Sequence, residues 1–384
     1  MTPRPGDRLI PQVVIGEPVI RARGLDWRSA HTEGGHVVAA LGAGTAVLTR
    51  EPAVEQSLQR FLDDNARAPY AATVLMEPAT GRVIAVAESS TRGDKSGLAF
   101  RPIARAASVF KVVTTSALLE AGVSADAEVC IHGGKTRMQP ALLVDDGRKD
   151  HKCTSLEDAL SHSQNVAIAK LALKHLEPAV LRSEARKWGF DAPLPMDVPL
   201  SQASPTSIPD DPFGFANAAA GFGDVKLSAL HGAVLASIVA NGGVMVPPQL
   251  VDAVRAGADS DVHGGMPELA KPVRVVDASV ARALGKMMRD TVAEGTGRKA
   301  FSASPRLQVM AAGKTGSLTD YQTGLETTWF IGYAPADHPE IAVATVVVNT
   351  SKWNVRAPLA AKEALRAYFA IHPATHGTDV VARR

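Results

Sequence analysis

Apolar residues recur at helical spacing in several segments of the chain. Val54, Leu58, Phe61 and Leu62 fall on one face, because residues three, four and seven positions apart lie together on a helix. This spacing predicts a helix over residues 51–65. Comparable patterns with capping residues predict helices over 105–121, 165–175, 227–241, 279–294 and 359–371, and a further one that begins at 154–157.

Continuous apolar runs predict strands elsewhere. Two runs flank the turn Pro78–Gly81 and predict a β-hairpin over 73–89. Runs near the other end of the chain predict strands over 309–311, 327–333 and 341–349. Because strands at both ends enclose helices, the pattern predicts an α/β or α+β fold whose sheet combines the hairpin with the last strands.

Proline and glycine interrupt this pattern in two regions. They are scattered through residues 1–50, for which we expect irregular structure. Six prolines between Pro193 and Pro212 predict a long loop, which either shapes a substrate cleft or only covers the domain.

Composition limits the class of protein. Of 384 residues, 46% are hydrophobic and 21% are charged, which suffices for a buried core and excludes disorder as the main state. The net charge of +2 gives no reason to expect a nucleic-acid partner. The most apolar stretch, residues 36–48, is too short and too rich in glycine to cross a bilayer. The chain is therefore either cytoplasmic or anchored by a segment that precedes it in the native protein.

Ser108 and Lys111 are the first candidates for chemistry. Residues three apart on a helix project from the same face, and a serine hydroxyl becomes a good nucleophile when a base takes its proton. A lysine amine is such a base when apolar surroundings lower its pKa. Val109, Phe110 and Val112 supply apolar neighbours here. Taken alone, the pattern Ser-x-x-Lys equally describes a helix cap beside a solvated lysine.

Two further groups carry polar side chains at suggestive places. Ser163 and Asn165 lie between two predicted helices, where they either point into one cleft or cap the second helix. The segment Lys314–Ser317 follows the run 309–311. A cation and a hydroxyl on an edge strand can bind a carboxylate, and a glycine there permits close approach of another backbone.

Together and in this order, the three groups resemble the penicillin-recognising serine acyltransferases, which carry Ser-x-x-Lys at a helix start, Ser-x-Asn between helices and Lys-Thr-Gly on a strand. Stretches that resemble the transpeptidase domain of penicillin-binding proteins lie at 71–87, 221–244, 292–301 and 328–335. The resemblance implies an antiparallel five-stranded sheet flanked by helices plus an all-helical subdomain. It also implies a domain at 66–372, after an N-terminal segment and linker helix (1–65) and before a C-terminal tail (373–384).

The resemblance implies a catalytic role for five of these residues: Ser108, Lys111, Ser163, Asn165 and Lys314. Ser108 is the expected nucleophile on a D-Ala-D-Ala stem peptide, and Lys111 is the expected base. Ser163 is expected to relay a proton to the leaving D-Ala, and Asn165 to hold the substrate amide and Lys111. The acyl group would then pass to an amine of a neighbouring stem peptide or to water. No cofactor is expected.

The strand motif is expected to bind substrate. The resemblance gives Lys314 an electrostatic role and assigns the terminal carboxylate to Thr315 and Ser317, which flank Gly316. The backbone N–H groups of Ser108 and Ser317 would form the oxyanion hole.

The activity expected from the resemblance is that of a peptidoglycan D,D-transpeptidase that β-lactam antibiotics acylate. A class A β-lactamase uses a glutamate to activate the deacylating water, and residues 185–267 contain none. We therefore expect a long-lived ester with β-lactams. Two alternatives remain open: a D,D-carboxypeptidase or slow β-lactamase using the same site, and a catalytically weak β-lactam-binding scaffold.

The two cysteines stand in mirrored contexts, Cys130-Ile131-His132 and His151-Lys152-Cys153. A disulfide between Cys130 and Cys153, two free thiols and a metal site are all compatible with this pattern. One residue between Cys and His is fewer than zinc sites usually have, so we expect no metal. In an oxidising compartment a disulfide is the simplest interpretation.

The expected substrate decides the expected compartment. Stem peptides lie outside the cytoplasmic membrane, so the resemblance implies a periplasmic or otherwise extracytoplasmic protein, anchored by a segment absent from this chain. A glycosyltransferase or another protein of the division or elongation machinery is a candidate partner.

Overall fold

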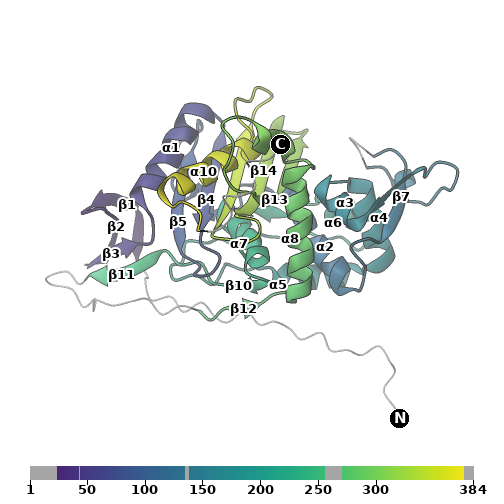
Figure 1. Ribbon diagram of the computed structural model, residues 1–384, viewed down its shortest axis with the longest axis horizontal. Helices are drawn as coiled ribbons and strands as arrows, with labels where there is room; N and C mark the ends of the chain where they lie inside the picture. The colour runs from purple at the N-terminus through teal and green to yellow at the C-terminus, as the bar shows by residue number, and fades with distance from the viewer. Residues whose placement is uncertain (1–23, 43, 135–137, 256–269, 376–384) are drawn as a thin grey trace, which may run out of the picture.

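The computed structural model describes residues 24–42, 44–134, 138–255 and 270–375. A five-stranded antiparallel sheet forms its centre (Figure 1). In spatial order its strands are β13 (Ala312–Asp320), β14 (Leu325–Ala334), β15 (Ile341–Asn349), β4 (Tyr70–Met76) and β5 (Val83–Ser89). The first hairpin therefore pairs with the last strands, as the sequence predicts. Every position of β15 is buried, because apolar layers cover both faces of this central strand.

Helices cover both faces of the sheet. One face packs against α7 (Ala229–Ala240), with α8 (Ala278–Ala293) beside β13, and the other against α1 (Pro52–Asn65) and α10 (Ala357–Ile371). The predictions for these four helices are confirmed to within two residues at each end. Helix α7 is buried almost all round, whereas α8 has a clear apolar stripe that faces the core.

A helical subdomain lies beyond α8, on the side away from β5 (Figure 1). Its helices are α2 (Lys111–Glu120), α3 (Leu156–Ser161), α4 (Asn165–His175), α5 (Pro178–Lys187) and α6 (Pro212–Ala219). Ser155 caps α3 by accepting a hydrogen bond from the Asp158 N–H, as its sequence indicates. The subdomain also carries a two-stranded sheet, β7 (Glu128–Ile131) with β8 (Lys152–Ser155), which the sequence pattern does not reveal.

The prediction of irregular structure before residue 50 is wrong for the part that the structure describes. Strands β1 (Leu25–Glu33), β2 (His36–Leu41) and β3 (Gly44–Leu48) form a four-stranded sheet with β11 (Val251–Arg255). Strand β1 is largely exposed and has no clear apolar alternation. Strand β3 pairs on one side with the adjacent β2, but its other neighbour, β11, lies some 200 residues away in the chain, so local pattern could not show the whole sheet.

Two further predictions need correction near the polar motifs. The strand expected over 309–311 begins instead at Ala312, and the segment Lys314–Ser317 lies within it. Pairing with β14 decides these bounds, and the polar residues of an edge strand hide them in the sequence. The helix expected from residue 105 begins as the 3₁₀ helix η2 (Ala107–Phe110) and becomes α-helical only at Lys111.

The long proline-rich loop is confirmed, since no helix or strand lies between α5 and α6. Its backbone bonds to neighbouring segments, with the Gln202 N–H donating to the Phe100 carbonyl, and Asp197 accepts from the N–H groups of Leu250 and Val251. The shorter elements are η1 (Leu98–Phe100), β6 (Ala104–Arg105), η3 (Pro140–Leu142), β9 (Lys226–Leu227), β10 (Val244–Met245), β12 (Val273–Arg274) and α9 (Arg298–Ser302). Across the described residues, no helix has both the length and the apolar character that a membrane span requires.

Candidate active site

Ser108 and Lys111 meet at the junction of two helical turns. Ser108 lies in η2 and Lys111 is the first residue of α2. The Lys111 Nζ is 2.6 Å from the Ser108 Oγ and 2.7 Å from the Oδ1 of Asn165, which begins α4. The amine therefore links the hydroxyl to a side chain 54 residues further along the chain.

The backbone holds Ser108 by a close approach from another loop. Ala107 has a φ of 51°, an unusual conformation for a residue with a side chain. Gly221, which follows α6, has a φ of 85°, and a Cβ at this position would lie 2.3 Å from the Ala107 carbonyl oxygen. A glycine is therefore required at residue 221 for the segment to support the serine.

Burial controls the charge of Lys111. The side chain is fully buried, so loss of hydration disfavours its ammonium form, and the nearby Lys314 acts in the same direction. Together they hold the pKa of Lys111 well below its usual range. An uncharged amine 2.6 Å from a hydroxyl can accept its proton.

Ser163 and Lys314 form a second linked pair. Ser163 lies between α3 and α4 with a φ of 56°. The Lys314 Nζ donates to the Ser163 Oγ and to the Thr315 carbonyl oxygen, each over 2.9 Å. Lys314 is also fully buried, and this burial lowers its pKa to about 7.

Strand β13 brings the rest of the motif to the serine. It is an edge strand, and its unpaired side faces η2, where a Cβ on Gly316 would lie 3.3 Å from the Ala106 carbonyl oxygen. Thr315 is half-buried, with its Oγ1 2.5 Å from that of Thr296, whereas Ser317 is exposed. A carboxylate bound here would meet hydroxyl groups beside a buried lysine.

These elements enclose a cleft of about 770 Å³. The candidates that line it are Ser108, Ser163, Asn165, Thr315 and Ser317. Sequence reasoning missed other lining residues, among them His162, Phe222, Thr296, Lys299 and Trp353. Thr296 and Lys299 lie in the stretch 292–301 that carries part of the resemblance, which was the available signal. No residue of the loop 188–212 lines the cleft. Of the two alternatives for this loop, the structure therefore favours the one in which it covers the domain and does not shape the cleft.

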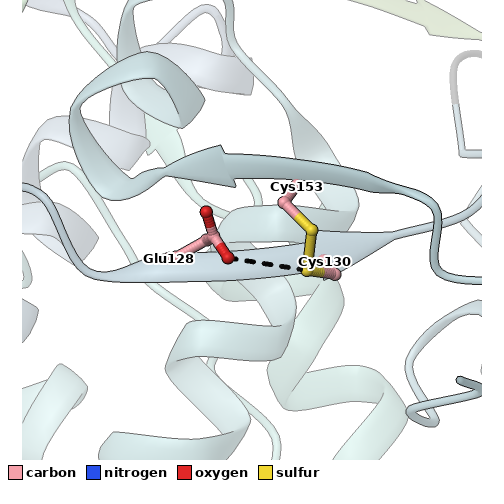
Figure 2. A group of neighbouring side chains, drawn as sticks. All are labelled: Glu128, Cys130 and Cys153. Carbon is pink, nitrogen blue, oxygen red and sulfur yellow. Dashed lines mark hydrogen bonds between the residues drawn. A yellow bond between two sulfur atoms is a disulfide. The ribbon is translucent and has the colours of Figure 1, made fainter.

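The cysteines lie outside this cleft, on the hairpin β7–β8. Cys130 and Cys153 face each other in register and form a disulfide (Figure 2). Glu128 lies beside them, with a carboxylate oxygen 4.0 Å from the Cys130 Sγ. This trio has the proximity of a metal site, but sulfurs bonded to each other have no thiolate to offer a metal.

Comparison with known sequences agrees with the family resemblance found in the three motifs. The family model described as "Penicillin binding protein transpeptidase domain" matches residues 71–366. A protein of Mycobacterium tuberculosis named peptidoglycan D,D-transpeptidase PbpA is 29% identical over 344 residues, which cover 80% of this chain and 67% of that protein.

Solved structures show the same fold. Penicillin-binding protein 3 of Mycobacterium tuberculosis, in complex with aztreonam, superimposes with a TM-score of 0.72 at 23% identity, covering 88% of this chain and 81% of that one. The D,D-transpeptidase domain of a peptidoglycan glycosyltransferase from Eggerthella lenta gives a TM-score of 0.71 at 21% identity, covering 91% and 92%.

Proposed function

Since the chain belongs to the penicillin-binding protein transpeptidase domain family, we propose that it is a serine D,D-transpeptidase that cross-links peptidoglycan stem peptides and is acylated by β-lactams. The D,D-transpeptidase activity for which the PbpA relative is named supports this proposal. The observation that carries the proposal is the direct contact of Ser108 with a fully buried lysine, whose pKa this burial holds well below its usual range.

In the first step, the Ser108 Oγ attacks the carbonyl carbon of the penultimate D-Ala and Lys111 takes the hydroxyl proton. Asn165 supports this step, because its Oδ1 holds the Lys111 Nζ at 2.7 Å. Ser163 passes a proton to the departing D-Ala amine, and its link to Lys314 keeps the hydroxyl oriented. The backbone N–H groups of Ser108 and Ser317 stabilise the oxyanion, each worth about 10²–10³ in rate in other acyl-transfer enzymes.

The terminal carboxylate of the donor binds at β13. Thr315 and Ser317 offer hydroxyl donors there, and Gly316 leaves room for the backbones to approach. A bound carboxylate favours the charged form of Lys314, whose pKa of about 7 lets it respond to this partner.

The cleft favours transfer to an amine over hydrolysis. None of the described residues that line it is an aspartate or glutamate, so no carboxylate stands ready to activate water. This supports a long-lived ester with β-lactams and disfavours the β-lactamase alternative.

The substrate gives the location. The protein acts outside the cytoplasmic membrane, where peptidoglycan lies. A glycosyltransferase or another protein of the division or elongation machinery would supply its glycan strands.

Intact-mass analysis after incubation with benzylpenicillin tests the proposal. We expect the wild type to gain the mass of the whole drug and keep it for hours, and Ser108→Ala to gain nothing. Ser279→Ala, which removes an exposed hydroxyl from α8, serves as the matched control and should behave like the wild type.

The other outcomes distinguish the alternatives. A transient adduct with hydrolysed drug would favour a slow β-lactamase. An adduct on Ser108→Ala would exclude this serine as the nucleophile. The absence of any adduct on the wild type would favour the scaffold.

A further inference from the structure

A second cavity, of about 850 Å³, adjoins the donor cleft. The two cavities share His162, Ser163 and Asn165, so they meet at the segment between α3 and α4. The second cavity then extends along the hairpin β7–β8, to Lys152 and the segment before it. The catalytic scheme above leaves this space unused.

Basic side chains line this second cavity. Lys149, Lys152, His132, His151 and His162 all border it, and none of its described lining residues is acidic. Lys149 pairs with Asp146 over 3.0 Å. Lys152 is exposed, and the described part of the chain provides it with no ion pair. The cavity therefore presents positive charge and imidazole groups to a ligand.

Asp150, which lies between the lining residues Lys149 and His151 in the sequence, is already paired with basic groups. Asp150 is almost buried and accepts hydrogen bonds from the Lys170 Nζ at 2.9 Å and from the His132 ring at 2.5 Å. Lys170 also donates to the Cys130 carbonyl oxygen, so the ion pair is joined to the disulfide-bonded hairpin. These contacts hold the hairpin beside the cavity in place and leave Lys152 free to attract an anion.

The shared residues connect this cavity to the reaction. Asn165 contacts the Lys111 amine, and Lys111 contacts the Ser108 hydroxyl. A ligand in the second cavity that contacts Asn165 is therefore connected to Ser108 through two hydrogen bonds, from Asn165 to Lys111 and from Lys111 to Ser108. The donor carboxylate is assigned to β13 in the first cavity, which leaves the second for the other substrate.

We propose that the basic cavity binds the acceptor stem peptide by its carboxylates and selects acceptors that carry them over amidated ones. The proposal rests on the proposed function and deepens it. In the transfer step, the acceptor amine forms a C–N bond to the ester carbonyl of acylated Ser108. The C–O bond of the ester breaks, and the amine proton returns to the Ser108 Oγ through Lys111. Nearby lysines also disfavour a protonated amine, so they favour the nucleophilic form of the acceptor.

Paired acceptors test this selection. The two probes are Nα-acetyl-L-lysyl-D-alanine and its C-terminal amide, which share the ε-amine and differ by one carboxylate. With a stem-peptide thioester as donor, the measured quantity is the ratio of transfer to hydrolysis. We expect the wild type to favour the carboxylate acceptor about fivefold, as a partly exposed charge pair allows. Lys152→Glu should abolish or reverse the preference.

Lys174→Glu is the matched control, because it makes the same charge change at an exposed position on α4 outside the cavity. It should keep the wild-type preference. Equal use of the two acceptors by the wild type, or equal effects of Lys152→Glu and Lys174→Glu, would overturn the proposal and leave the proposed function intact.

A binding measurement separates the two proposals fully. Calorimetry with Ser108→Ala needs no turnover, and it should show tighter binding of the carboxylate peptide than of the amide, with Lys152→Glu removing the difference. A failure of the wild type to form an acyl-enzyme would count against the proposed function alone. Equal binding of the two peptides would count against the basic cavity.

Discussion

At the scale of single residues, the main feature of the site is a pair of lysines whose pKa values are lowered by burial. Lys111 and Lys314 are both fully buried, and for both the loss of hydration is the main cause of the lowered pKa. For Lys314 the pKa falls from 10.5 when unfolded to about 7 when folded. Between these values the unfolded chain binds more protons, so the contribution of Lys314 to stability increases as pH rises from 7 to 10.5.

Lys314→Met should therefore change stability and activity in opposite directions. We expect loss of acylation, together with an increase of about 1–2 kcal/mol in the free energy of unfolding at pH 7, because a desolvated amine is replaced by an apolar side chain. Urea titrations at pH 7 and 9.5 should show a smaller pH dependence than in the wild type. Lys174→Met, at an exposed lysine, should change neither property. A less stable Lys314→Met with unchanged pH dependence would contradict this account.

Gly221→Ala should displace the nucleophile. The new Cβ would lie 2.3 Å from the Ala107 carbonyl oxygen, so the segment that carries Ser108 must move. A shift of about 1 Å at a reacting atom costs on the order of 10²-fold in rate, which stopped-flow acylation by a chromogenic β-lactam would measure. Gly242→Ala is the control, because it shares a positive φ of 61° but has no atom within 4 Å of the new Cβ. Equal acylation by both variants would show that the close approach does not matter.

At the scale of elements, three pieces converge from distant parts of the sequence. The turn η2–α2 supplies Ser108 and Lys111, and the α3–α4 junction supplies Ser163 and Asn165. The edge strand β13 supplies Lys314 and the hydroxyl groups that we propose bind the donor carboxylate. The edge position of β13 matters, because a neighbouring strand would occupy the side that faces the serine. The hairpin β7–β8 lies beside this assembly, and the disulfide between Cys130 and Cys153 bridges its two strands.

Replacing both cysteines should loosen the hairpin. The disulfide closes a loop with a sequence separation of 23, so Cys130→Ser with Cys153→Ser should lower the free energy of unfolding by about 3 kcal/mol. Chemical denaturation measures this change, and hydrogen exchange should show faster exchange in β7 and β8 than in the central sheet. The wild type under reducing conditions should match the double variant. Unchanged stability would mean that other contacts hold the hairpin.

At the scale of the whole molecule, the N-terminal strands belong to the same folding unit as the catalytic part. The main core cluster joins Val37 and Leu48 of the N-terminal sheet with Phe100 and Leu250. Trp27 also packs edge-on against Phe100. The hydrophobic core is therefore continuous across residue 65, where the sequence predicts the start of the transpeptidase domain.

Leu48→Ala tests this unity. Leu48 is buried, so its truncation should cost about 2–5 kcal/mol and lower the midpoint of one cooperative transition followed by circular dichroism and by loss of acylation. Val144→Ala, at a side chain that is 66% exposed, should have little effect. Two separate transitions, with acylation lost only in the second, would show instead that the N-terminal sheet unfolds on its own.

The sequence by itself determined the reactive groups and most regular elements. The spacing of Ser108 and Lys111, the position of Asn165 at the start of a helix and the apolar runs of the central sheet are local features. Such features depend on residues close together in the chain, so the sequence pattern alone reveals them. The hairpin 73–89 and the helices that flank the sheet were predictable for the same reason.

Only the tertiary structure decided the features that depend on distant partners. The strand β3 pairs with β11 across some 200 residues, Thr296 meets Thr315 through side chains, and the basic cavity forms where β8 passes the α3–α4 junction. The lowered pKa values of Lys111 and Lys314 belong to this class as well. Desolvation depends on every element packed around a group, and no short segment of sequence contains that information.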